Sequence, residues 1–132
     1  MHRVYEERAG QYPKRRKIIG RKQMTVKNIA ERLSLRALSM PDPEREATCG
    51  YAGDLLSWVM GRAAEGSVWA TVMTNVNVIA VAALADTAAV VICEDSAVPD
   101  DVISVAKEKG INLFSSELPI YEFCVALSQV IK

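Results

Sequence analysis

From Met24 onward, hydrophobic and polar positions follow two alternating spacings along the chain. Segments with apolar residues every three or four positions, typical of helices, are separated by short runs rich in β-branched residues, typical of strands. Single helices between successive strands predict right-handed crossovers and a mainly parallel sheet. We therefore expect one compact α/β domain over residues 24–132, with a mainly parallel sheet flanked by helices.

Five segments have the cap and the periodicity of a helix. They are TVKNIAERLSL capped by Thr25, a segment from Asp54, TNVNVIAVAALAD capped by Thr74 or Asn75, VPDDVISVAKEKG, and a final segment from Pro119. The fourth is the clearest, because acids fill its first turn, lysines its last, and Gly110 follows. On the helix from Asp54 we expect one buried face, made of Leu55, Leu56, Val59, Met60 and Ala63.

The predicted strands are the runs RALS, EATCGYA, SVWATVM, AAVVIC and INLFS. AAVVIC is continuously apolar, which favours a strand covered on both faces. Cys93 ends this strand, so we expect it in the core.

Residues 1–23 do not share this pattern. They contain eight Lys and Arg against Glu6 and Glu7, a net charge of +6, and the zero net charge of the whole chain leaves −6 for the rest. Such a split favours nucleic-acid binding in some proteins. Here Tyr5 and Tyr12 are the only aromatic residues among the charges, and no apolar period is sustained. We therefore interpret residues 1–23 as a flexible basic extension and do not expect nucleic-acid binding.

The composition predicts a cytoplasmic protein. No apolar run approaches the roughly 20 residues that cross a membrane, and no apolar signal region begins the chain. The three cysteines lie far apart without a Cys-x-x-Cys pair, which is typical of reduced thiols.

Several kinds of catalytic and metal chemistry are excluded. The one histidine, His2, lies in the basic extension, so the domain lacks the residues for Ser/His/Asp catalysis and for histidine-containing metal sites. We expect no metal and no cofactor. The segment from Gly61 to Gly66 and Ser67 has the spacing of a phosphate-binding loop but lacks its lysine and follows a helix. We interpret it as a helix end and a turn.

Polar residues gather at the predicted carboxyl ends of the strands, where ligands bind in open parallel sheets. In chain order they are Tyr51, Gly53 and Asp54, then Thr74, Asn75 and Asn77, then Glu94 and Asp95, then Ser115 and Ser116. Helix capping is the alternative role for Thr74, Asn75 and Ser116, and a solvated loop is the alternative for Glu94 and Asp95. Capping does not explain why Gly50 and Gly53 remove side chains from the neighbouring loop, so both interpretations stay open.

The stretch EREATCGYAGDLLS resembles the signature of the DRTGG domain family. The core Thr-x-Gly-Tyr-Ala-x-Asp-Leu-Leu-Ser, the run TNVNVIAVA and the run AKEKGINLFSS carry this resemblance, which extends from Thr25 to about Ile131. Two departures are Glu44 in place of the family's aspartate and Cys49 in place of its first glycine. The resemblance implies a fold similar to the N-terminal domain of HPr kinase/phosphorylase and to the DRTGG domains of phosphotransacetylases and CBS-type pyrophosphatases.

The resemblance further implies a regulatory or ligand-sensing domain without catalytic activity of its own, since the kinase chemistry of HPr kinase/phosphorylase lies in another domain. We expect a small anionic or nucleotide-like ligand, or a partner protein. The candidate ligand-binding residues are Thr48, Gly50, Tyr51, Asp54, Thr74, Asn75, Asn77 and Ser115. The alternatives are a purely structural oligomerisation module, and a small enzyme that uses Asp54 with Ser57 or Ser115.

A homo-oligomer, most simply a dimer, is also expected. Apolar residues surround most of the helix Val76–Ala85, and a helix apolar on all sides is usually buried on all sides. On the preceding helix Trp58 lies off the apolar stripe, and tryptophan is a common interface residue. The DRTGG resemblance also implies paired subunits. Trp58 is therefore the candidate interface residue.

Overall fold

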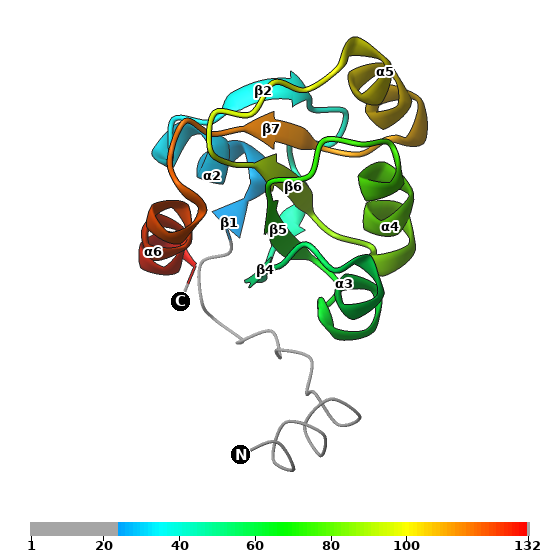
Figure 1. Ribbon diagram of the computed structural model, residues 1–132. Coiled ribbons are helices and arrows are strands. Elements are labelled where there is room, and N and C mark those ends of the chain that lie inside the picture. Colours follow the sequence, from blue (N-terminus) through cyan, green and yellow to red (C-terminus); the bar gives the residue numbers. More distant parts are fainter. Residues whose placement is uncertain (1–23, 132) are drawn as a thin grey trace.

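A five-stranded sheet forms the middle layer of the protein, in a computed structural model that describes residues 24–131 (Figure 1). The strands lie in the order β2-β7-β6-β5-β4, with β4 to β7 parallel and β2 antiparallel to β7. Their bounds are β2 (Arg36–Ser39), β4 (Cys49–Ala52), β5 (Ser67–Thr71), β6 (Ala89–Ile92) and β7 (Leu113–Ser115). The prediction of an α/β domain with a mainly parallel sheet is confirmed.

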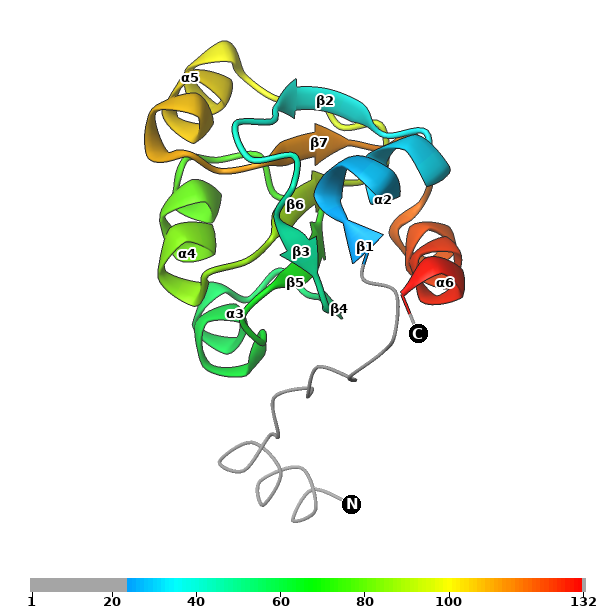
Figure 2. The same ribbon diagram turned by 180° about the vertical axis from the view of Figure 1, so that it is seen from behind.

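Five helices cover the two faces of this sheet within the described residues. The helices α2 (Val26–Arg32) and α6 (Ile120–Val130) lie on one face. The other face carries α3 (Leu56–Arg62), α4 (Asn77–Ala85) and α5 (Asp100–Lys109), as the views from front and back show (Figures 1 and 2).

Each face of the sheet has its own hydrophobic core. Phe114, Phe123 and Leu127 belong to the core under α2 and α6, whereas Trp69 and Ile79 belong to the core under α3, α4 and α5. All four residues of β6 are buried, because helices cover it from both sides. The predictions of a doubly covered AAVVIC strand and of a core position for Cys93 are confirmed.

The predicted ends of two helices, α2 and α5, are confirmed. Thr25 caps α2 by accepting a hydrogen bond from the Asn28 N–H, and the Asn28 side chain accepts one from the Thr25 N–H in return. The helix α5 follows Pro99 and ends at Gly110, whose φ of +73° is the left-handed conformation that glycine adopts without strain.

The predicted EATCGYA strand was wrong in one respect, because the segment forms two strands. Its first part, β3 (Glu46–Ala47), pairs antiparallel with β1 (Met24–Thr25) in a separate two-stranded sheet. Its second part is β4, which pairs with β5. The chain changes partner at Thr48, whose N–H donates to the Gly66 carbonyl.

The predicted start and buried face of α3 also need correction. Leu55, and not Asp54, occupies the N-cap position, and no side chain caps this helix. Leu55 and Met60 are about half exposed, at 53% and 49%. A helix of only seven residues presents one narrow stripe to the sheet, made of Leu56, Val59 and Ala63.

The Gly61–Gly66 segment is a helix end followed by a turn, as predicted. Arg62 is the last residue of α3, and Gly66 enters β5 with a φ of +81°. The prediction of a flexible basic extension falls on residues 1–23, which lie outside the described residues.

Candidate functional site

Asp54 ties the end of β4 to the end of β5. Its Oδ1 atom accepts a hydrogen bond of 2.6 Å from the Thr71 hydroxyl and one of 3.1 Å from the Val72 N–H. The Thr71 hydroxyl in turn accepts a bond from the Met73 N–H at 3.2 Å. Hydrogen bonds to an ionised carboxylate are about twice as strong as neutral ones. The Asp54 carboxylate therefore fixes the chain where it leaves β5, which explains why it does not cap α3.

The loop after β6 is bound to the loop after β7. The Glu94 and Asp95 N–H groups donate to the carbonyls of Leu118 and Ser116, at 2.8 and 3.0 Å. The Glu94 carboxylate accepts a hydrogen bond of 2.8 Å from the Ile120 N–H, which is the first residue of α6. Glu94 is thus more than a solvated loop residue, because its negative charge holds the N-terminus of a helix.

Backbone conformation sets the direction of these two carboxylates. Glu94 and Asp95 have φ values of +66° and +52°, in the left-handed region that costs non-glycine residues free energy. Both residues are exposed, and the hydrogen bonds of the two joined loops offset the cost.

A buried thiol lies beside this edge of the sheet. Burial raises the pKa of the Cys93 thiol to about 12, and smaller contributions come from the Cys124 thiol and from the Glu94 and Asp54 carboxylates. A thiol that stays protonated at neutral pH is a poor nucleophile. The Asp54 and Glu94 carboxylates follow β4 and β6, so both lie at the carboxyl edge of the parallel sheet, and together they form its acidic region.

The sheet register places one positive charge at the opposite end of this edge. Arg36 lies opposite Ser115, the last residue of β7, in the antiparallel β2–β7 pair. Carboxylates accept hydrogen bonds but donate none. The acidic region is therefore suited to hydroxyl and amino groups, and the Arg36 end to an anionic group.

The start of α4 contributes amide groups to the same edge. The Asn75 side chain accepts a hydrogen bond of 3.0 Å from the Asn77 N–H. The N-cap of α4 is Val76, and neither Thr74 nor Asn75 occupies the cap position predicted for it. Thr74 and Asn77 have no side-chain hydrogen bond within residues 24–131. Their polar atoms remain available at the carboxyl end of β5.

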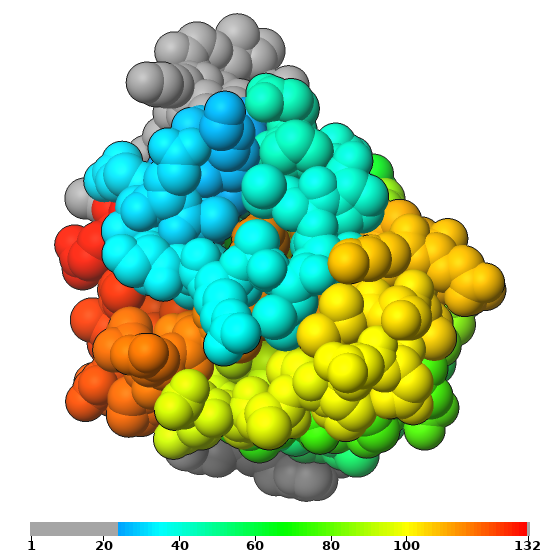
Figure 3. All heavy atoms as spheres, turned by 90° about the horizontal axis from the view of Figure 1, so that it is seen from above, coloured from blue at the N-terminus to red at the C-terminus, as the bar shows by residue number. Residues whose placement is uncertain are grey.

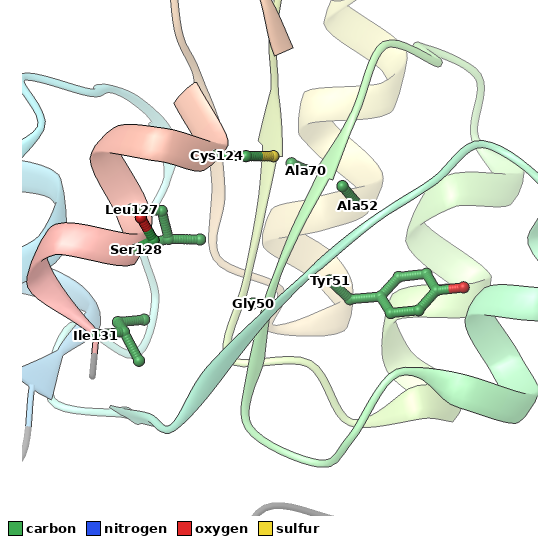
Figure 4. Close-up of a pocket in the computed structure, with 8 residues that line it drawn as sticks. All are labelled: Gly50, Tyr51, Ala52, Ala70, Cys124, Leu127, Ser128 and Ile131. Atoms are coloured by element: carbon green, nitrogen blue, oxygen red, sulfur yellow. The ribbon is translucent and has the colours of Figure 1, made fainter. Parts of the chain in front are cut away.

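A groove of about 290 Å³ lies between β4 and α6 (Figure 4). It is lined by Gly50, Tyr51, Ala52, Ala70, Cys124, Leu127, Ser128 and Ile131. The α6 side chains point toward the strand, whereas the Tyr51 ring points to the opposite face of the sheet (Figure 4). The groove is mostly apolar, with Ser128 and Cys124 as its polar side chains.

The two glycines near β4 have packing reasons. A Cβ atom on Gly50 would lie 2.8 Å from the Leu127 Cδ2 atom, closer than real Cβ contacts allow. A Cβ atom on Gly53 would lie 3.3 Å from the Tyr51 ring. Both glycines thus lie against side chains of the same chain, so they do not by themselves indicate close ligand approach.

The candidate residues therefore fall into three places. Asp54, Thr74, Asn75, Asn77 and Ser115 lie at the carboxyl edge of the sheet, and Gly50 and Tyr51 line the groove. Thr48 precedes β4, and its hydroxyl donates to the Glu65 carbonyl at 3.3 Å, so it lies at the amino end of the strand.

Sequence reasoning missed Thr71 and the α6 side of the groove. Thr71 is fully buried and donates a hydrogen bond to the Asp54 carboxylate. Its position as a polar residue at the end of an apolar strand is the sequence signal for such a bond. The position of Ser128 beside β4 depends on how α6 packs across the sheet, for which the sequence has no local signal.

Within residues 24–131, no group of three or more His, Cys, Asp or Glu side chains is placed to hold a metal ion. Among the helices described, none has the length and apolar character needed to span a membrane.

No protein-family model matches the sequence, and no curated protein matches it. Among solved structures, the chain is similar to the CBS and DRTGG domains of the regulatory region of Clostridium perfringens pyrophosphatase, complexed with the activator diadenosine tetraphosphate. The TM-score is 0.63 at 12% identity, over 81% of this chain and 46% of that one. The chain thus spans about half the length of that structure. At this identity the likeness shows the fold alone, and it agrees with the DRTGG resemblance at that level.

Proposed function

We propose that this protein is a non-catalytic regulatory domain that binds a small nucleotide-like ligand at the carboxyl edge of its parallel sheet. The main support is the cluster of Asp54, Thr71 and the Val72 N–H, which fixes a carboxylate beside the amide groups at the start of α4. The second Asp54 oxygen makes no hydrogen bond within the described residues, and the residue is exposed. The carboxylate is therefore free to accept a bond from a ligand.

The chemistry of this edge favours a nucleotide over a simple anion. Ribose hydroxyls and the adenine amino group are hydrogen-bond donors, which suits the Asp54 and Glu94 carboxylates. Phosphate groups suit the start of α4, where the Thr74 hydroxyl and the Asn77 side-chain amide can donate hydrogen bonds and the helix dipole attracts negative charge. The activator bound to the structurally similar pyrophosphatase region is also a nucleotide.

A thermal-shift screen tests this proposal with ATP, ADP, AMP, diadenosine tetraphosphate and phosphorylated metabolites. A ligand at 100 times its Kd stabilises the native state by about 2.7 kcal/mol, which is readily measured as a higher Tm. Asp54→Asn should remove most of the ligand-induced increase in Tm. The control Glu108→Gln alters an exposed carboxylate near the end of α5 and should leave the shift unchanged. No shift with any compound at millimolar concentration would contradict the proposal.

A structural oligomerisation module is the second candidate. It is favoured by large apolar side chains at the surface of the single chain, including Trp58, Leu84 and Tyr121 at 51%, 75% and 76% exposure. A homodimer is part of our proposal in either case. A cytoplasmic location is likewise proposed from the three separate cysteines.

An enzyme that uses Asp54 with Ser57 or Ser115 is the third candidate. The Asp54 carboxylate is hydrogen-bonded to Thr71 and Val72, and not to either serine. Activation of a serine hydroxyl requires a base within hydrogen-bond reach. We therefore expect no turnover of labelled ATP by the purified protein, and catalytic turnover would favour this third candidate.

A further inference from the structure

The strand β4 is an open edge of the sheet. It is the last strand in the sheet order and pairs with β5 on one side, and no strand within residues 24–131 pairs with its other side. Such an edge presents unpaired backbone N–H and C=O groups, which are a template for pairing with another strand. Gly50 and Ala52, on the groove side of β4, are both exposed.

The two edges of this sheet are not equivalent. The opposite edge strand, β2, begins at the charged Arg36 and shifts register between Ala37 and Ser39, and both features discourage edge-to-edge pairing. Figure 3 looks onto that edge, where β2 (cyan) lies between α2 (blue) and α5 (yellow to orange). In contrast β4 has the sequence Cys-Gly-Tyr-Ala, with no charge, no proline and an unbroken register with β5.

Apolar side chains flank β4 on the α6 side. Ser128 lines the groove beside β4, and Val125 and Tyr121 lie three and seven residues before it, on the same side of α6. Val125 and Tyr121 are 45% and 76% exposed. This side of α6 therefore extends the apolar surface of the groove beyond the strand.

Apolar side chains also flank β4 on the α3 side. Leu55 and Trp58 lie three residues apart and are 53% and 51% exposed. In a right-handed β4–α3–β5 crossover, the side of α3 that carries them faces outward past β4. The Arg62 guanidinium lies 4.0 Å from the Trp58 ring centroid, a cation–π contact that orients the ring.

We propose that two copies of this chain pair through β4, antiparallel about a twofold axis, to form one continuous sheet across a dimer. A twofold axis perpendicular to the sheet brings the α3 flanks together on one face and the α6 flanks together on the other. On the α3 face the flank is apolar apart from the Arg62 guanidinium, which stacks on Trp58, and on the α6 face it consists of Tyr121, Val125 and Ser128. The inference does not depend on ligand binding.

The available area suits a stable dimer. Leu55, Trp58, Val125 and Tyr121 each leave on the order of 100 Å² exposed. With the strand edge and the groove wall, one copy supplies roughly the 800 Å² per partner that a standard interface buries. A second copy fits better than an unrelated peptide because the surface is complementary to itself.

Light scattering of the full chain over a range of concentrations tests the proposal. The expected mass is about twice the 14.5 kDa of one chain at micromolar concentration. Ala52→Lys places a charge on the open edge and should raise the dimer dissociation constant about tenfold or more. The matched control, Ala37→Lys, makes the same change in the opposite edge strand and should leave the constant within about twofold.

A second pair of variants tests the flanks. Trp58→Glu should weaken the dimer as Ala52→Lys does, whereas Leu84→Glu on the outer surface of α4 should not, although Leu84 is more exposed. Circular dichroism and melting curves of all four variants confirm that each is folded. A monomeric parent, or a dimer that survives both Ala52→Lys and Trp58→Glu, would overturn the proposal.

Amide hydrogen exchange distinguishes a second copy from the chain's own residues 1–23 as the group that covers β4. Pairing between copies predicts that protection of the Gly50 and Ala52 amides falls as the protein is diluted below its dissociation constant. Protection that is independent of concentration in a monomer would overturn the proposal in favour of coverage within one chain.

Discussion

At the scale of single residues, Gly50 in β4 faces the Leu127 side chain of α6. A methyl group there would lie 2.8 Å from the end of the Leu127 side chain, which is flexible enough to move at a cost. We expect Gly50→Ala to lower the free energy of unfolding by about 1–3 kcal/mol, as overpacking does. Gly61→Ala is the control, because nothing lies within 4 Å of the added carbon. It should stabilise by about 0.5–1 kcal/mol.

The double variant Gly50→Ala with Leu127→Ala checks the cause. Leu127→Ala alone costs about 2–5 kcal/mol through the cavity that it leaves. If contact between the two side chains causes the loss, the double variant is more stable than the sum of the single changes predicts. Additive losses in urea unfolding would show that Gly50 is required for another reason.

Cys93 is the residue whose ionisation links stability to pH. Its pKa is raised from 9.0 to about 12 in the folded protein, chiefly by burial, so the folded state holds the proton more tightly than the unfolded state. This contribution to stability is complete below about pH 9 and is lost as the pH rises toward 12. Urea unfolding of wild type and Cys93→Ala across pH 8–11 measures it. An equal alkaline slope in both proteins would contradict the assignment.

At the scale of elements, the α6 helix depends on Glu94 for its first turn. The carboxylate accepts the Ile120 N–H at 2.8 Å from a loop that is 26 residues away in sequence. Removal of a helix cap costs about 0.5–2 kcal/mol, and we expect Glu94→Ala to fall in this range. The control Glu117→Ala alters an exposed carboxylate in the loop before α6. A similar loss in both variants would show that general charge, and not the cap, is responsible.

Most elements of this fold are predictable from the sequence because their signals are local. The proline, the charges and the terminal glycine of α5 all lie within 12 consecutive residues. The run AAVVIC contains only apolar residues, and this composition predicts a buried strand. The split between β3 and β4 has no such signal, because it depends on which distant strand each half meets. Asp54 is misjudged for the same reason, since its partner Thr71 is 17 residues away.

The candidate site is only partly predictable on the same grounds. The rule that parallel strands end at one edge brings Asp54, Thr74 and Asn75 together correctly. Thr48 was grouped with them by the signature resemblance, although it lies at the other end of β4. The groove residues of α6 are not predictable, because helix placement across the sheet is a property of the packed molecule.

At the scale of the whole molecule, residues 24–131 form two hydrophobic cores, one on each face of the sheet. We propose that residues 1–23 are dispensable for folding. A chain that begins at Met24 should have a Tm within a few degrees of the full chain. In a domain of about 110 residues, a loss of 1 kcal/mol in the free energy of unfolding lowers the Tm by about 4 °C or more, so a contribution from residues 1–23 would be measurable. A larger drop by calorimetry would show that residues 1–23 contribute to the stability of the domain.

The central claim is that the carboxyl edge of the sheet binds a nucleotide-like ligand. Titration of the ¹⁵N-labelled protein with ATP and the other nucleotides, followed by NMR, tests it most directly. Binding at this edge predicts concentration-dependent shifts of the Asp54, Val72 and Asn77 amides, with the Glu108 amide unchanged and the Asp54 shifts absent in Asp54→Asn. Shifts confined to other surfaces, or no shift at millimolar nucleotide, would contradict the account.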